Sequence, residues 1–280
     1  MVMNDVEPKI TRFSGVLLFI AAFLLLTAIF NVLSPAADKT MIYFYSSETN
    51  INNFKSLKME FDQYLSKFGP YEFQPFKGRE AFEKHVKGRK NCLLVMSSWH
   101  YRHIYKEYSL TPAAAGVRNG KKYQKRLLVA GGAALGIDAV KTERIASSSS
   151  IDHTGSVLKG MLKGKFKANI LRILTVPKDI DALMSVGFGM SNLALTTKNS
   201  LDELTIVNPV LCKKMKILLE GDETLLLILA VPEGFEKADH KVVSIIKDMA
   251  LNPDGKRKIR MLGLDGWQAL DPSDMAQLES

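Results

Sequence analysis

Short apolar runs alternate with amphipathic helical patterns along most of this chain, and this alternation restricts the possible folds more than any other feature. The run MIYFY at 41–45 is typical of a buried strand, because strands covered on both faces are continuously apolar. Residues 51–68 then place apolar side chains at spacings of three and four, which predicts one apolar face of a helix. NCLLVMSS at 91–98 predicts another buried strand. This order indicates an α/β fold with a largely parallel sheet.

The remainder of the chain extends the pattern into a second α/β block. Asn119-Gly120 is a turn signal in the crossing region that leads to this block. The order of the elements predicts that the chain returns to the first block near its end. Further helices are expected at 79–88, 99–110 and 237–250 and at the start of 178–190, and further strands at 71–76, 127–130, 169–176, 191–197 and 204–210.

The N-terminal region contains an apolar block at 13–33, and no charged residue lies between Arg12 and Asp38. The block is long enough to cross the roughly 30 Å hydrocarbon core of a bilayer as a helix. Basic residues precede the block, which favours a cytoplasmic N-terminus and an exported body. Small residues at 34–38 would also suit signal cleavage. Residues 1–38 are therefore predicted to be a signal anchor, which we favour, or a cleaved signal peptide.

The composition, 46% hydrophobic and 24% charged, fits a folded globular protein. The formal net charge is +9, and the basic residues are spread along the chain rather than gathered in one arm. Such a field attracts small anions and gives little support to nucleic-acid binding, so we expect no nucleic-acid partner.

Metal-binding and disulfide patterns are weak. Cys92 and Cys212 have no metal-type spacing, and Cys92 in its apolar run is typical of a small buried side chain. A long-range disulfide between them stays open as an alternative. His100 and His103 could share one helix face, but no third ligand is nearby in the sequence. We expect no metal and no cofactor.

The stretch RIASSSSIDHTGSVLKGML at 144–162 places four consecutive serines between a short strand and a predicted helix. The first N–H groups of a helix lack partners within the helix, and together with hydroxyls they can hold a small anion. The alternative is a polar linker without a ligand.

The order of these pieces resembles the phosphonate/phosphate-type solute-binding proteins of ABC transporters, which have the type II periplasmic-binding fold. The resemblance covers about 41–275: MIYFYSSETNINNFKSLKMEFDQYLSKF is similar to the opening strand, loop and long helix of that family, and IRMLGLDGWQALDPSDM is similar to its C-terminal motif. It implies an α/β, two-lobed fold, with lobe one at 39–120, lobe two at 121–219 and a return to lobe one at 220–280. It also implies a small anionic ligand, an ABC permease as partner, and a position on the periplasmic side of the membrane, tethered by the N-terminal segment if that is not cleaved.

The ligand-binding residues that we expect are hydroxyl groups at the ends of strands. Tyr101 falls where the family has a tyrosine, and the serine-rich stretch falls on the family's ligand loop. The expected ligand-binding residues are Ser148, Ser149, Ser150, Thr154, Tyr101, Ser46, Ser47, Ser97 and Ser98.

Two departures from the family pattern keep other functions open. The segment GFGMSNLALTT has no acidic residue where the family has one, and acidic residues at 220–223 replace an expected proline-rich crossing. An alternative is therefore a degenerate binding-fold domain that serves as a sensor or assembly module. An enzyme is not expected, because only a Ser150–His153 pair suggests a catalytic dyad, and it rests on sequence proximity alone.

Overall fold

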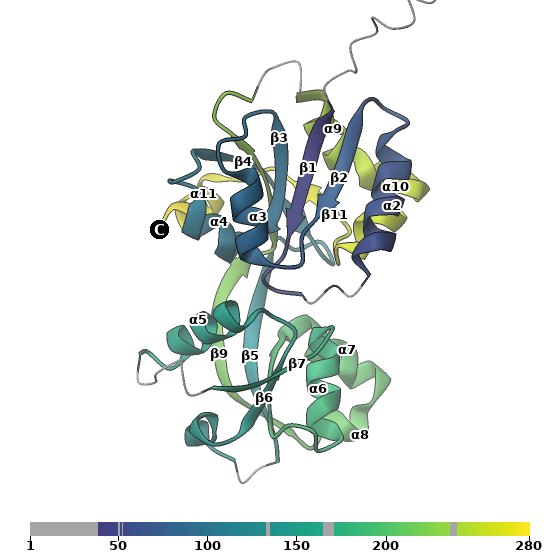
Figure 1. The fold of residues 1–280 in the computed structure, drawn as a ribbon. Coiled ribbons are helices and arrows are strands. Elements are labelled where there is room, and N and C mark those ends of the chain that lie inside the picture. Colours follow the sequence, from purple (N-terminus) through teal and green to yellow (C-terminus); the bar gives the residue numbers. More distant parts are fainter. Residues whose placement is uncertain (1–38, 50, 52, 133–134, 165–170, 236–239) are drawn as a thin grey trace, which may run out of the picture. The chain divides into compact units, whose positions relative to one another are not determined.

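The first of two β-sheets contains both early and late parts of the chain. The computed structural model describes residues 39–49, 51, 53–132, 135–164, 171–235 and 240–280 (Figure 1). The sheet has the order β11-β4-β10-β3-β1-β2, and β1 pairs in parallel with both β2 and β3. Its strands are β1 (Thr40–Tyr45), β2 (Tyr71–Pro75), β3 (Cys92–Ser97), β4 (Leu110–Val117), β10 (Leu227–Pro232) and β11 (Gly266–Gln268).

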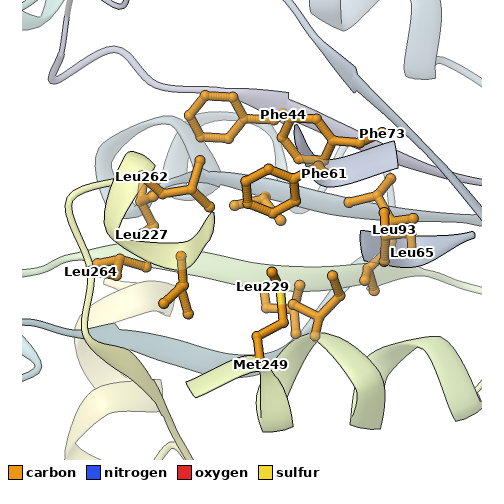
Figure 2. Close-up of a cluster of buried hydrophobic side chains, with 14 of the residues drawn as sticks. Phe44, Phe61, Leu65, Phe73, Leu93, Leu227, Leu229, Met249, Leu262 and Leu264 are labelled. Carbon is orange, nitrogen blue, oxygen red and sulfur yellow. The ribbon is translucent and has the colours of Figure 1, made fainter. Parts of the chain in front are cut away.

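Helices cover both faces of this sheet, because the side chains of its strands alternate between two apolar clusters. In β1, Ile42 and Phe44 join one cluster, which is shown in Figure 2, whereas Tyr43 and Tyr45 join the other. The first cluster is covered by α2 (Phe54–Leu65), α9 (His240–Lys247) and α10 (Pro253–Met261). The second is covered by α3 (Arg79–Val86), α4 (Ser98–Ile104) and α11 (Pro272–Glu279).

The second sheet has the order β7-β6-β8-β5-β9, and the side chains of its strands also alternate between two apolar clusters. Leu127 and Val129 pack toward α6 and α7, whereas Leu128 and Ala130 pack toward α5 and a short 3-10 helix. The strands are β5 (Tyr123–Gly131), β6 (Arg144–Ser147), β7 (Arg172–Thr175), β8 (Leu193–Thr197) and β9 (Met215–Leu225). The helices are a 3-10 helix (Ile137–Lys141), α5 (Ile151–Met161), α6 (Asp179–Gly187), α7 (Lys198–Val207) and α8 (Pro209–Cys212).

Residues Thr40–Ser280 form one compact unit that holds both sheets. We call residues 40–117 with 227–280 the first lobe and residues 123–225 the second lobe. The chain passes between the lobes twice, from β4 to β5 and from β9 to β10.

Two sequence-based predictions of local structure are wrong. Residues 204–210 are not a strand: Thr197 accepts a hydrogen bond from the N–H of Ser200 and begins α7, which runs to Val207. The second lobe also extends past the predicted boundary at 219, because β9 continues to Leu225 along β5. The acidic residues at 220–223 therefore belong to an edge strand rather than to the crossing.

The two cysteines are free, so the structure contains no disulfide between them. Cys92 lies in the core of the first lobe and Cys212 packs against that of the second. The predicted N-terminal anchor or signal lies outside the described residues. None of the helices in the described ranges has the length and hydropathy that a membrane span requires.

Candidate functional site between the lobes

The serine-rich loop contacts the first lobe directly. The strands β1, β3 and β6 end at Tyr45, Ser97 and Ser147, and the hydroxyl-bearing residues predicted from the sequence follow these ends. The N–H of Ser150 donates to the carbonyl oxygen of Ser47 at 2.8 Å, which joins the lobes at this point. In open α/β sheets, ligands bind beyond the carboxyl ends of the strands, so this junction is the candidate site.

The hydroxyls of Ser148, Ser149 and Ser150 all have partners within the protein, and Ser148 and Ser149 are buried. Ser148 donates to Asp179 Oδ1 at 2.6 Å and lies 3.2 Å from the carbonyl oxygen of Glu48. Ser149 donates to the same carbonyl oxygen at 3.4 Å. Ser150 instead begins α5, where its hydroxyl accepts from the N–H of His153. The hydroxyls of these three serines therefore divide between contacting the first lobe and capping the helix.

Three predicted residues of the first lobe lie at the same junction. Ser46 Oγ accepts from the N–H of Glu48 at 3.2 Å. The hydroxyls of Ser47 and Ser97 are 2.5 Å apart and fully buried, and Ser97 also caps α4. The structure thus brings the ends of β1 and β3 together with the serine-rich loop.

Three other predicted residues are held elsewhere. Tyr101 is buried in the first lobe, where its hydroxyl donates to the carbonyl oxygen of Leu110 at 3.0 Å. Ser98 donates to the carbonyl oxygen of Leu225, where the chain leaves the second lobe. Thr154 is bonded to Ser147 Oγ at 2.9 Å within the second lobe. Each of these hydroxyls has a partner within the protein, and none of them is bonded to Glu48.

A buried ionic cluster occupies the centre of the junction. Arg126, on β5, places Nη1 2.8 Å from Asp179 Oδ1 and Nη2 3.3 Å from Glu48 Oε2. Gln124 donates to the same Glu48 oxygen. The three charged side chains are at most 10% exposed. Two carboxylates therefore share one guanidinium in a region that excludes most water.

Burial has a clear electrostatic consequence for Glu48. It raises the pKa of the carboxyl group above its ordinary value, and the nearby Asp179 carboxylate acts in the same direction. The positive charge of Arg126 and the bond from Gln124 offset part of this effect. The charged form of Glu48 thus depends on Arg126 remaining in place.

Little free volume remains at this position. The described residues enclose a cavity of about 20 Å³ here, room for roughly one water molecule. It is lined by residues of both lobes, among them Ser46, Glu48, Gln124, Arg126 and Asp179. The Nε atom of Arg126 is buried and has no hydrogen-bond partner among the described residues.

A second contact between the lobes involves Trp99, at the start of α4. Its Nε1 donates to Ser156 Oγ at 3.0 Å, and its ring meets that of His153 edge-on at 5.3 Å. The Arg79 guanidinium lies 5.7 Å from the same indole ring and 3.8 Å from Asp152. Side chains in the first turns of α5 thus contact Trp99 and Arg79 of the first lobe, in addition to the contact made by the serine-rich loop.

The histidines do not form the arrangements that the sequence left open. His100 Nε2 lies 2.8 Å from Glu83, whereas His103 Nδ1 faces the carbonyl oxygen of Trp99. Among the described residues, no group of three or more histidine, cysteine or acidic side chains could hold a metal ion. Ser150 meets the backbone of His153 rather than its ring, whose Nδ1 is buried without a partner. The pair is therefore a helix cap and not a catalytic dyad.

Sequence reasoning missed the ionic cluster, although each member left a signal. Glu48 directly follows Ser46 and Ser47, and Arg126 directly precedes the apolar LLVA run of β5. Asp179 opens α6 just after β7. A charged residue at the end of a buried strand is costly unless it is paired, which is the general signal for such a cluster.

The two sheets and their connections have the architecture of the type II periplasmic-binding fold. No family model matches the chain, and no curated protein matches its sequence. Solved structures do match over nearly its whole described length. They confirm the resemblance at the level of the fold.

One of these structures is a component of an ABC phosphonate transporter, another contains methylphosphonate and a third contains ATP. A binding protein component of an ABC phosphonate transporter from Pseudomonas aeruginosa matches with a TM-score of 0.62 and 14% identity, over 86% of this chain and 85% of that chain. PhnD1 from Prochlorococcus marinus, solved with methylphosphonate, gives 0.58 and 12%, over 86% and 94%. A Xanthomonas citri protein bound to ATP gives 0.61 and 12%, over 87% and 95%.

Proposed function

We propose that this chain is an exported solute-binding protein that holds a small oxyanion, phosphonate-like or phosphate-like, between its two lobes. The observation that supports the proposal best is the convergence of buried hydroxyls and one guanidinium at the junction. Ser148 and Ser149 reach it from the second lobe together with Arg126. Hydroxyl and guanidinium donors suit phosphoryl oxygens, and Arg in particular matches their geometry.

The comparisons support the same class of ligand. One matching structure is named as part of a phosphonate transporter and another contains methylphosphonate. We infer that delivery to an ABC permease follows closure of the lobes around the ligand. Export is inferred from the apolar block at 13–33, with the body tethered to the membrane if that block is retained.

Calorimetric titration of the full chain tests this proposal. We expect heat on addition of methylphosphonate, phosphate or phosphite, and a loss of affinity of at least tenfold in Ser148→Ala/Ser149→Ala. Ser66→Ala is the matched control, because Ser66 is an exposed residue that ends α2. Equal affinity in the double variant and the control would contradict the assignment of the serine-rich loop.

A second function is favoured by the small volume at the junction. A cavity of about 20 Å³ is too small for a phosphonate while Glu48 occupies its present position. A binding-fold domain that serves as a sensor or an assembly module would need no room for a solute. Absence of heat with every one of these anions, for wild type and for variants that enlarge the cavity, would favour this function.

A further inference from the structure

The donors that converge on the junction all reach one residue of the opposite lobe. Ser148 Oγ, Ser149 Oγ and Arg126 Nη2 contact the carbonyl oxygen of Glu48 at 3.2, 3.4 and 3.4 Å. Arg126 Nη2 and Gln124 also donate to its carboxylate. Glu48 therefore has four partners in the second lobe, although it belongs to the loop that follows β1.

The chemistry of these contacts is that of a bound oxyanion. Glu48 offers a carboxylate and a carbonyl oxygen, both acceptors, to the Ser149 hydroxyl, an amide and a guanidinium, and the Ser148 hydroxyl lies beside the same carbonyl oxygen. Its side chain is only 8% exposed, so its negative charge is stabilised by Arg126 rather than by water.

We propose that Glu48 is an internal anion that takes the place of a free ligand, so that the chain itself holds its lobes closed. This inference rests on the proposed function, because it assumes that the same donors serve a solute. A solute anion must then displace the Glu48 carboxylate, and Glu48 sets both the affinity and the selectivity of the site. Asp179 stays beside Arg126 whether Glu48 or a solute occupies the site. Only part of the positive charge of Arg126 is therefore left for the solute.

The charge pattern also predicts how Glu48 affects the affinity for an anion. With Glu48 in place, two carboxylates face one guanidinium, so a second anion entering the cluster would be repelled. Removing the Glu48 charge should therefore raise anion affinity rather than lower it. An ordinary ligand contact would behave in the opposite way.

Titration of inorganic phosphate and methylphosphonate into the full chain, followed by calorimetry, tests the inference. We expect Glu48→Ala to bind at least tenfold more tightly than wild type, and Glu48→Gln to lie between them. Glu220→Gln, a change at an exposed carboxylate on β9 that faces Lys125, is the matched control and should bind as wild type does.

A second measurement reports closure without any ligand. Trp99 lies between the lobes, whereas Trp267 packs against the first core, so a Trp267→Phe background isolates Trp99. We expect acrylamide to quench Trp99 weakly in this background and more strongly when Glu48→Ala is added. Phosphate should then restore the protection in the Glu48→Ala form.

The outcomes distinguish failure of the internal-anion proposal from failure of the proposed solute-binding function. If wild type binds an anion as tightly as Glu48→Ala does, the internal-anion proposal is overturned while the solute-binding function stands. If no form binds either probe, the oxyanion function fails, and quenching decides the internal-anion proposal. Stronger quenching in Glu48→Ala then supports it, and equal quenching overturns it.

Discussion

At the scale of single residues, Arg126 is the side chain on which the junction depends most. It is paired with both Glu48 and Asp179, and all three groups are largely removed from water. Removing one partner of a buried ion pair is far more harmful than replacing the whole pair, because a charge is left behind without compensation.

We therefore expect Arg126→Met to lower the free energy of unfolding by about 3 kcal/mol or more. Lys125→Met is the matched control: Lys125 is a neighbour on the same strand whose partner, Glu220, is 3.5 Å away and exposed. The control should change stability by about 0.5 kcal/mol or less. Denaturant unfolding of both variants measures the difference, and similar losses in the two would count against a buried cluster.

His100 gives the protein a predictable pH dependence. Burial lowers its pKa to about 4, and its bond to Glu83 offsets only part of this effect. Below the ordinary pKa of about 6.5, the unfolded chain binds a proton that the folded chain refuses. This contribution to stability is therefore complete above pH 6.5 and is lost as the pH falls toward 4.

Unfolding measured at pH 7.5, 6 and 4.5 checks this expectation. The loss attributable to His100 should be about 3 kcal/mol at most, from a difference of about 2.5 pKa units. His100→Gln should flatten the profile. Burial also lowers the pKa of His153, so part of the slope remains in His100→Gln. An unchanged slope in His100→Gln would rule His100 out as a source.

At the scale of helices and strands, two glycines test how tightly the elements pack. A Cβ atom added to Gly255, in the first turn of α10, would lie 2.2 Å from the carbonyl oxygen of Met249. A Cβ atom added to Gly160, in α5, would meet nothing within 4 Å. The two positions differ in their surroundings and not in the residue itself.

Gly255→Ala should lower stability by about 2 kcal/mol, since backbone atoms would have to move. Gly160→Ala should raise it by about 0.5–1 kcal/mol, because alanine favours a helix over glycine. Thermal unfolding of the two variants measures these opposite changes in stability. Equal shifts for both would mean that α10 does not pack on Met249 in this way.

The elements were predictable where the apolar pattern is regular and not where local propensity competes with capping. The buried strand at 41–45 and the helix at 51–68 follow from the spacing of apolar side chains alone. The segment at 204–210 is rich in β-branched residues, which favour strands, yet the cap at Thr197 starts a helix that extends into it. The exposed positions of Ile206 and Val207 show that packing does not oppose that helix.

The candidate site was predictable only in part, for a related reason. The serine-rich loop has a local signal, since hydroxyls gather where a helix begins. The partners of that loop come from distant positions, Glu48 and Arg126, and only the pairing of the two lobes brings them together. A single sequence gives the charges but not their partners.

At the scale of the whole molecule, the central claim is that the two lobes meet at the serine-rich loop. Closure there joins backbone and side chains of both lobes around Glu48, with Trp99 and the first turns of α5 as a second contact. The proposed function requires relative motion of the lobes to admit a ligand, and the two passages of the chain between the lobes are where such motion would be accommodated.

Hydrogen exchange of the full chain tests this claim most directly, read in peptides that contain Ser150. Its N–H donates to Ser47 across the junction, so the account predicts slow exchange in wild type and faster exchange in Glu48→Ala. Peptides from β5, such as those containing Val129, should stay protected in both. Fast exchange at Ser150 in wild type, as fast as in an unstructured peptide, would contradict the account.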